Sequence, residues 1–540
     1  MNDVYKHREE VCEYLRLDVV SMKELYRIFN DMIYEILQVN ITEYLTLPAL
    51  AFDTWNRFLY ELSQNEKFII EIPDKEKYQF IRKCVYGGRV SCNKKDFMNK
   101  DYQQKFNNVL NELNLSYQDY INISDKEKNE IDMKIAKRMD YNDVKNSNDY
   151  IFNADVSSLY PTAMKGNDLL KVRYPVGCSR WSNIPTYEFK DNKLGFYEIN
   201  YKSPKLMHPI LPTRKHDGGI EWTCEDGHGY YTNIEIEEAI RMGYKVQFLN
   251  KCLVYDEYRE DIYDKYISTW YTLKQNEDNK LKQEKNNVLR EICKLFMNAL
   301  YGKMLQKSYF EIDIIVNNTR EIYEFARNHY ITNIELLGSG KVLLSGTTKE
   351  EDQNNQINKP SQYGAFVLSY SRKLMNIYNK ILDPKLKSLT VTYTDTDSMH
   401  VFGSDHKKLC EMELVKTQLG FLANDVKDGD GVIIMEKNLG SKLYMYKYLN
   451  NKNEIKTVAK AKGLPKKYLQ QKFFLEGTGE VIIKDSFKKV FTKVNSKEKE
   501  NNIDMFTIRK EDMIRSFNKT LYSGRELRDD GVYYPRGFFN

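Results

Sequence analysis

The segment that most constrains the fold of this chain is residues 389–401, in which two runs of β-forming residues flank Asp395-Thr396-Asp397. Such runs on either side of a short polar break predict a β-hairpin with two carboxylates at its tip. Two carboxylates that close repel each other unless a cation lies with them. The alternative is a plain tight turn, because Asp is a common turn residue. A turn, however, requires neither two acids nor strong β-formers up to its edge.

Another carboxylate stands at the end of a predicted strand far upstream. Residues 150–156 alternate as a strand does, and Pro161 prevents continuation, so Asp155 lies where the backbone turns. The alternative is an Asp that caps the following helix. Brought together, Asp155 and Asp397 would form an oxygen-rich site for two Mg²⁺ ions ~3.5–4 Å apart. Such a pair of ions supports nucleotidyl transfer, which requires no His or Cys nucleophile.

Residues 256–303 predict one or two long helices, and the last of them has one polar and one apolar side. With each residue turning the helix by roughly 100°, the polar side falls within about 80°. It carries Arg290, Lys294, Asn298 and Tyr301. The apolar side carries Ile292, Leu295, Phe296, Ala299 and Leu300. The polar row predicts contacts to phosphates and bases, although a solvated helix face has the same pattern.

Residues 440–448 alternate aromatic and basic side chains, and lysines follow at 460, 462, 466 and 467. This alternation can present a strand edge to a sugar-phosphate backbone, but it equally describes an ordinary amphipathic strand. Across residues 441–500 there are 15 Lys, no Arg and 6 acidic residues, an excess hidden in the near-neutral net charge of +5 for the whole chain. We therefore predict a phosphate-facing surface here.

The chain's length of 540 residues predicts roughly three to five structural units rather than one core. Residues 186–255 predict short strands and a helix, and residues 361–381 predict a helix. Residues 93–149 are strongly polar, which predicts a surface insertion or a partly ordered excursion.

The eight cysteines show no Cys-x-x-Cys pair, which argues against a disulfide scaffold or zinc ribbon and suits a reducing compartment. No apolar run approaches the ~20 residues that cross a bilayer. Residues 1–20 carry too many charges for a signal peptide, and their acidic residues fit poorly with a mitochondrial presequence. We therefore expect an intracellular protein that is not secreted and has no membrane partner.

Three segments resemble motifs A, B and C of family B DNA polymerases, and they occur in that family's order. They are Asp155-x-x-Ser158-Leu159-Tyr160-Pro161, Lys294-x-x-x-Asn298-Ala299-x-Tyr301-Gly302, and Tyr393-x-Asp395-Thr396-Asp397-Ser398. Lys442-Leu443-Tyr444 resembles the family's Lys-x-Tyr element. The gaps of 139 residues from Asp155 to Lys294 and 91 from Gly302 to Tyr393 leave room for the two inserted regions of the protein-primed branch. That branch occurs in linear plasmids, organellar elements, viruses and small phages.

The resemblance implies an α+β fold, the right-hand polymerase fold of palm, fingers and thumb, with two inserted subdomains and a remnant of a 3′–5′ exonuclease domain. In order, the implied regions are an exonuclease remnant (1–60), a first palm part (61–186, with the polar insertion 93–149), a first inserted region (187–255), fingers (256–305), a second inserted region (306–365), a second palm part (366–453) and a thumb (454–540).

The resemblance also implies roles for individual residues. Asp155, Asp397 and the backbone carbonyl of Val156 would hold two Mg²⁺ ions, with Mn²⁺ as a substitute, and Asp395 would support the site. The incoming dNTP would be bound by Ser158, Leu159, Tyr160, Lys294, Asn298 and Tyr301, with Lys294 holding the triphosphate and Tyr160 excluding a ribose 2′-hydroxyl. The DNA template and primer would be contacted by Tyr393, Thr396, Lys442, Tyr444, Gly87, Gly88 and Lys462. A terminal priming protein is a further implied partner.

The sequence departs from the family pattern in two places. Residues 85–88 resemble the Tyr-x-Gly-Gly element, but Val85 stands at its first position. Tyr14-x-x-x-Asp18 resembles the last of three exonuclease motifs, whose first two would precede residue 1. A lone carboxylate cannot assemble a two-metal site, so we expect no proofreading by this chain, as in a truncated, split or remodelled polymerase.

The sequence is compatible with three functions. The first is a DNA-directed DNA polymerase that replicates a plasmid, viral or organellar element, in a mitochondrion, a virus or the host cytoplasm. The second is an RNA-making or reverse-transcribing polymerase, against which Tyr160 and the Asp-Thr-Asp hairpin argue. The third is a non-catalytic fragment that binds DNA or a priming protein.

Overall fold

The computed structural model describes residues 8–215, 218–281, 283–308, 311–337, 340–349, 353, 356–426, 429–491, 506–518 and 524–539. The chain forms two compact units, each of which is described by itself. One consists of Met1–Ile69 with Arg259–Gln306, and the other of Ile70–Tyr258 with Lys307–Asn540. All eight cysteines are free thiols, as their spacing predicts. Among the described residues, no helix is long and apolar enough to cross a membrane.

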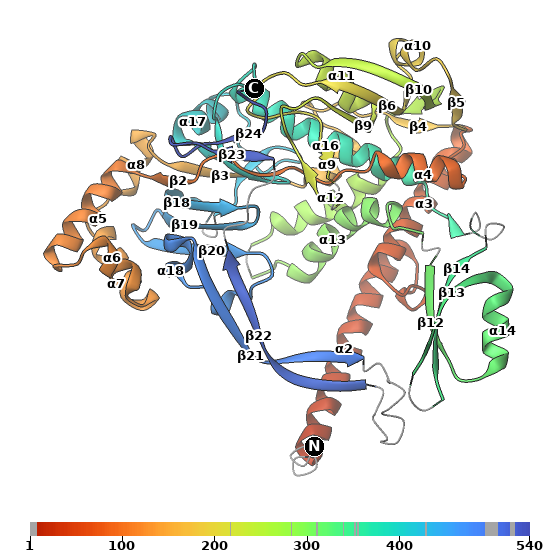
Figure 1. Ribbon diagram of the computed structural model, residues 1–540, viewed down its shortest axis with the longest axis horizontal. Helices are drawn as coiled ribbons and strands as arrows, with labels where there is room; N and C mark the ends of the chain where they lie inside the picture. The colour runs from red at the N-terminus through yellow and green to blue at the C-terminus, as the bar shows by residue number, and fades with distance from the viewer. Residues whose placement is uncertain are drawn as a thin grey trace. The chain divides into compact units, whose positions relative to one another are not determined.

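The first unit is helical (Figure 1). Its elements are α2 (Arg8–Leu37), η1 (Ile41–Glu43), α3 (Leu47–Asn65), α12 (Asp264–Asp278) and α13 (Asn287–Met304). The buried face of α3 packs against α12 and α13, where the Trp55 ring stacks on Tyr263 with centroids 5.5 Å apart. Residues 1–60 and 256–305, predicted as separate regions, thus share one core, because the apolar face of α3 is covered by the two later helices.

The centre of the second unit is a nine-stranded sheet built from distant parts of the chain (Figure 1). Its main order is β1 (Val90–Cys92), β15 (Val391–Asp395), β16 (Ser398–Phe402), β3 (Ile151–Val156), β18 (Val432–Gly440), β19 (Leu443–Leu449) and β20 (Ile455–Ala461). In addition, β17 (Leu422–Asn424) pairs with β3, and β2 (Asp96–Met98) pairs with β18. The strand predicted at 150–156 and the hairpin predicted at 389–401 are both confirmed.

The two faces of this sheet have different neighbours. Because side chains alternate along a strand, Tyr393 and Thr394 point to opposite faces. Tyr393 packs in an aromatic cluster with Tyr444 and Tyr446, whereas Thr394 lies against residues of α16 (Ser361–Leu382). This helix also packs against α9 (Leu159–Lys165). The predicted helix at 361–381 is thereby confirmed.

Residues 93–149 form an ordered helical subdomain rather than a partly ordered excursion. After β2 come α5 (Lys100–Glu112), α6 (Tyr117–Asn122), α7 (Asp125–Ala136) and α8 (Tyr141–Ser147). Their polar sequence conceals a buried aromatic core of Tyr102, Phe106 and Tyr120. Capping boxes begin α6 and α7, at Ser116 and Ser124. Short helices with good caps and one aromatic face need few apolar residues, so composition alone underestimated their order.

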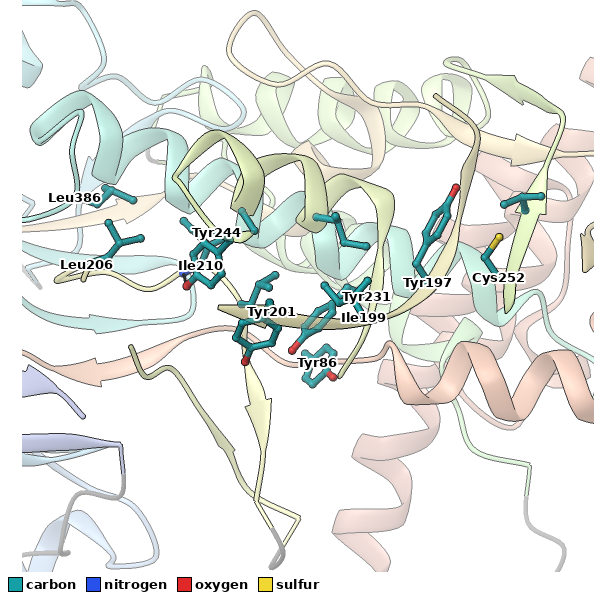
Figure 2. Packing of buried hydrophobic residues seen from close by; sticks show 14 residues of the cluster. Tyr86, Tyr197, Ile199, Tyr201, Leu206, Ile210, Tyr231, Tyr244, Cys252 and Leu386 are labelled. Carbon is teal, nitrogen blue, oxygen red and sulfur yellow. Dashed lines mark hydrogen bonds between the residues drawn. The ribbon is translucent and has the colours of Figure 1, made fainter. Parts of the chain in front are cut away.

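The first predicted inserted region, 187–255, supplies three strands of a four-stranded sheet, and the edge strand β5 precedes it. The order is β5 (Arg180–Ser182), β10 (Lys245–Tyr255), β6 (Leu194–Lys202) and β9 (Gly227–Thr232), with α11 (Asn233–Arg241) packed on the sheet. Figure 2 shows its core, in which Tyr86 lies beside Tyr201 and Tyr231. The Tyr86 and Tyr231 rings stack with centroids 5.4 Å apart. The segment that precedes β1 is thus anchored in this region's core.

The second predicted inserted region is a separate three-stranded sheet in the order β12 (Glu311–Val316), β14 (Val342–Thr348) and β13 (His329–Leu336), with α14 (Thr319–Asn328) packed on it through Phe325. Further along, α18 (Gln471–Glu476) leads into a long hairpin of β21 (Thr478–Phe491) and β22 (Phe506–Asn518).

The last strands, β23 (Arg525–Leu527) and β24 (Tyr533–Pro535), belong to a different part of the fold from that hairpin. The amide of Tyr533 donates to the carbonyl of Asn93, and Arg536 pairs with Glu221 and Glu225. The remaining elements are α4 (Lys75–Lys83), β4 (Tyr174–Val176), α10 (Pro185–Lys190), β7 (Thr213–Arg214), β8 (Ile220–Glu221), β11 (Glu257–Arg259), α17 (Gly403–Glu411) and η2 (Lys466–Tyr468).

Candidate active site

Strand pairing brings the predicted carboxylates together on one sheet. Ser398 lies opposite Asp395 in β15 and opposite Asp155 in β3, so these side chains share one face. Asp397 occupies the turn between β15 and β16, and its carbonyl accepts a hydrogen bond of 2.8 Å from the amide of Val156. Residues that are 242 positions apart in the sequence, Asp155 and Asp397, are therefore neighbours in the fold.

The alternative role of Asp155 as a helix cap is not what the structure shows. The N-cap of α9 is Ser158, and Asp155 lies within β3 three residues earlier. The backbone turns sharply here because Ser158 adopts a left-handed conformation with φ of 59°. This turn places the buried Leu159 and the half-buried Tyr160 in the first turn of α9.

The electrostatics at the turn suit a cation. Burial raises the pKa of Asp397, and the neighbouring charges of Asp395 and Asp425 raise it further, against the lowering effect of its own backbone hydrogen bond and of Lys442. A divalent cation would relieve this crowding of like charges. Among the described residues, no three His, Cys, Asp or Glu side chains form a metal cage by themselves. The two neighbouring carboxylates of Asp155 and Asp397 fit Mg²⁺, which takes one or two carboxylates and completes its shell with water and phosphate oxygens.

Asp425 is a carboxylate that the sequence reasoning missed. It follows β17, and its amide donates 2.9 Å to the carbonyl of Asn153 in β3. Its charge raises the pKa of Asp397, Tyr444 and Tyr446. The strand that delivers it has only three residues, too short for a periodicity signal.

Lys442 is ion-paired with Asp395, with its Nζ 2.7 and 2.8 Å from the two carboxylate oxygens. Its amide donates 2.9 Å to the Tyr393 hydroxyl. Tyr393 is fully buried, and Tyr444 packs on it with centroids 4.6 Å apart and is itself almost completely buried. The rings of Tyr393 and Tyr444, both predicted to bind DNA, are thus buried in the core next to Lys442. All seven residues of β19 are buried, unlike the half-exposed amphipathic strand that the alternation suggested.

Three predicted site residues have left-handed backbone conformations, which are costly for residues other than glycine. They are Ser158, Thr396 and Lys442, with φ of 59°, 63° and 57°. Such conformations cost about 1–3 kcal/mol each and persist where the surroundings enforce them. Thr396 is β-branched, and its amide is held by a 2.8 Å hydrogen bond to the carbonyl of Arg89. Among the described residues, three of the ten non-glycine residues with positive φ are therefore predicted site residues.

The predicted glycine pair lies against the same turn. A Cβ added at Gly88 would lie 2.7 Å from the Thr396 methyl, so only glycine fits there. A Cβ on Gly87 would meet nothing within 4 Å. The exposed Lys462 donates its amide to the carbonyl of Lys442 at 3.1 Å. These residues surround the turn, and their contacts to DNA stay predictions.

A buried His–Glu contact lies behind the hairpin, and no pattern in the sequence indicated it. The His400 ring on β16 contacts the carboxylate of Glu436 on β18, and both are completely buried. Thr392 donates 2.7 Å to the other carboxylate oxygen. This pair links β16 to β18 close to the turn that carries Thr396 and Asp397.

The remaining predicted residues lie on helices of the first unit. On α13, Lys294 is exposed and Asn298 and Tyr301 are partly buried. Arg290 is held by Asp278 at 2.6 Å, so its charge is already engaged. Leu295, predicted to lie in the core, is 53% exposed, because the buried face of α13 is rotated toward Cys293 and Met297.

Tyr14 and Asp18 are both exposed, one turn apart on α2. This spacing puts the two side chains on one side of the helix. Their role as an exonuclease remnant stays a prediction.

Comparison with known proteins agrees with this architecture. The structure of Phi29 DNA polymerase complexed with primer-template DNA and incoming nucleotide substrates superposes with a TM-score of 0.56, covering 88% of this chain and 68% of that one at 14% identity. The fold is therefore that of a right-hand polymerase, as the motifs predicted.

Sequence comparison gives the family. Residues 1–108 and 116–384 match the family described as DNA polymerase type B, organellar and viral, and the chain belongs to it. A probable DNA polymerase of Neurospora intermedia is 24% identical over 486 residues, which are 86% of this chain and 40% of that protein. A DNA polymerase of Kluyveromyces lactis is 24% identical over 482 residues, 85% of this chain and 39% of that protein. The chain thus spans about two-fifths of the length of these relatives.

Proposed function

We propose that the chain is a template-directed DNA polymerase that adds dNTPs to a 3′ end by two-metal nucleotidyl transfer. The observation that carries this proposal is the pairing of Asp155 with Ser398, which sets two carboxylates from distant segments beside each other at a strained turn. Family membership supports it, and so does the likeness to a polymerase solved with primer-template DNA and nucleotides.

Asp155 and Asp397 would hold two Mg²⁺ ions, together with the backbone carbonyl of Val156. When bound, such ions activate an attacking hydroxyl and stabilise the leaving pyrophosphate. Asp395 supports the site differently, because its charge is engaged by Lys442. The pair orients the strand that leads into the turn, so its proposed role is to support Asp397 and Asp155 rather than to hold metal itself.

The substrate contacts extend the proposal. Tyr160, at the start of α9, would exclude a ribose 2′-hydroxyl from the site. Lys294, Asn298 and Tyr301 would bind the incoming dNTP from α13, Lys294 through its exposed ammonium. The DNA template and primer would lie along Thr396, Gly88 and Lys462, where phosphates favour basic and backbone donors.

The wider setting is also proposed. The subdomains at 187–255 and 306–365 would receive a terminal priming protein, whose hydroxyl can replace the primer end. The element replicated would be a plasmid, viral or organellar DNA, in a mitochondrion or in a virus and its host cytoplasm.

Primer extension with Mg²⁺ tests the proposal. We expect extension by wild type with dNTPs but not rNTPs, and loss of extension in Asp397→Asn. Asp405→Asn on α17 is the matched control, since that partly buried Asp lies outside the site and should leave extension intact. Equal extension by wild type and Asp397→Asn would remove the metal assignment. No extension by wild type would favour a non-catalytic fragment that binds DNA or a priming protein.

A further inference from the structure

A buried ion pair links the first inserted region to α16. Glu235 lies on α11 and Arg372 on α16, and both side chains are almost completely buried. The guanidinium meets one carboxylate oxygen of Glu235 through Nε at 2.9 Å and through a terminal nitrogen at 2.8 Å. Burying two charges costs desolvation free energy, so a buried ion pair is weak evidence for a stabilising role. The contacts that Arg372 makes therefore matter more here than its contribution to stability.

Further hydrogen bonds fix the orientation of the pair. The second carboxylate oxygen of Glu235 accepts from the Ser369 hydroxyl at 2.9 Å and from the Thr232 hydroxyl at 3.4 Å. Ser369 also accepts from a terminal nitrogen of Arg372 at 3.3 Å. Both carboxylate oxygens are therefore occupied, and the guanidinium has one preferred placement.

The other terminal nitrogen of Arg372 holds the segment of residues 85–89, called here the glycine loop. It donates to the carbonyl of Tyr86 and, at 3.4 Å, to that of Gly87. The Tyr86 ring is stacked on Tyr231 in the core shown in Figure 2. The glycine loop is thus fixed by its carbonyls through Arg372 and by its ring through the inserted region.

The glycine loop also holds the turn of residues 395–397 between β15 and β16. Gly88 lies against Thr396 with no space for a Cβ, and the carbonyl of Arg89 accepts from the Thr396 amide at 2.8 Å. The next residue, Val90, pairs with Asp395. A β-branched residue at φ of 63° needs its surroundings to hold it, and the glycine loop supplies that constraint.

We propose that Glu235 is a positioning residue for the reaction, acting through Arg372 and the glycine loop on the turn that carries Asp397. The inference rests on the proposed function only for its kinetic consequence, because the mechanical link can be measured without activity. The first inserted region is thereby connected to the turn that carries Asp397. A displacement of α11 would be transmitted through Arg372 and the glycine loop to Thr396.

The test compares Glu235→Gln with Glu238→Gln. Glu238 is an equally buried glutamate on the same helix, paired with Lys380 at 2.7 Å and with Arg241 at 3.2 Å, and it has no contact with the glycine loop among those described. In hydrogen exchange on the whole chain, we expect Glu235→Gln to lose protection at residues 85–90 and 391–398, and Glu238→Gln to keep it. In primer extension, the Mg²⁺ concentration for half-maximal rate should rise by about tenfold in Glu235→Gln alone, as for other residues that orient metal ligands.

A second variant guards against simple misfolding. The double change Glu235→Gln with Arg372→Met removes both charges while filling the space, so the fold should persist while the tether to the glycine loop is lost. It should show the same loss of protection and the same Mg²⁺ shift. Equal protection in Glu235→Gln and wild type, or equal effects of Glu235→Gln and Glu238→Gln, would overturn the inference. If wild type does not extend primers yet Glu235→Gln alone loses protection, the proposed function fails and the link stands.

Discussion

Removing the charge of Asp132 should destabilise the second unit strongly, although Asp132 lies in a segment that the composition marked as a polar excursion. Asp132 on α7 and Lys447 on β19 are both almost completely buried, with Nζ 2.5 Å from the carboxylate. The Tyr120 hydroxyl lies 2.9 Å from the same Nζ, and the Tyr102 hydroxyl donates 3.2 Å to the other carboxylate oxygen. Burial opposes the charge on Lys447, yet Asp132 and Tyr120 together raise the pKa of this ammonium above its usual value.

The size of the effect follows from what Asp132→Asn leaves behind. The variant keeps the shape of the side chain but leaves the ammonium of Lys447 buried without a counter-charge. Breaking a buried pair in this way costs about 3–5 kcal/mol. The double variant Asp132→Asn with Lys447→Met buries no charge and should recover most of that loss, because a buried pair replaced by neutral groups is often nearly neutral in stability.

Urea denaturation, with hydrogen exchange of α7 as the local readout, measures these differences. Arg138→Gln is the control, because it breaks an exposed pair with Glu112 in the same subdomain and should have little effect on the free energy of unfolding. If Asp132→Asn costs no more than Arg138→Gln, the buried pair does not hold the helical subdomain to β19. If the double variant is as unstable as Asp132→Asn, the loss comes from packing rather than from an unpaired charge.

Three further outcomes are expected. Without metal at neutral pH, Asp397→Asn should be more stable than wild type in thermal denaturation. Burial and repulsion raise the pKa of Asp397, so the ionised carboxylate of wild type destabilises the fold by an amount that grows as pH rises through the raised pKa. A less stable variant would contradict this. Burial lowers the pKa of His406 from 6.5 to about 4. The free energy of unfolding should therefore fall as pH drops through this range, by at most about 1.4 kcal/mol for each pH unit. Urea denaturation of His406→Asn at the same pH values should lack this dependence. DNA affinity should fall steeply with salt concentration. If Lys466 and Lys467 both neutralise phosphates, replacing both by Gln should reduce the slope of log affinity against log salt concentration by about 2. An unchanged slope would assign the two lysines to solvated surface.

The parts of the site that carry strong local patterns were predictable from sequence. Asp155 and Asp397 each stand at the end of a β-rich run, and the turn chemistry around Asp395-Thr396-Asp397 is local. The strand and hairpin boundaries agree with the structure to within a residue or two. The Lys-rich prediction for 441–500 is described only in part, because residues 492–500 lie outside the described residues.

What the sequence could not supply are contacts that depend on strand order. Glu436 and His400 are in contact because β16 and β18 lie on either side of β3. The periodicity within β16 or β18 does not indicate which strands lie next to it in the sheet. Asp425 is delivered by a three-residue strand, and Lys447 meets Asp132 across more than 300 residues. The alternation of aromatic and basic residues around Tyr444 allows either a strand edge that faces a sugar-phosphate backbone or an ordinary amphipathic strand, but β19 is covered on both faces. Alternation reports a half-exposed strand only where one face stays open.

The central claim is that Asp155 and Asp397 jointly hold the divalent cations, and anomalous diffraction from Mn²⁺ in crystals of the chain with primer-template DNA and a dNTP tests it most directly. We expect two Mn²⁺ positions, with carboxylate oxygens of Asp155 and of Asp397 among their ligands and phosphate oxygens completing the shells. Mn²⁺ bound elsewhere, or bound to only one of these two residues, would contradict the account.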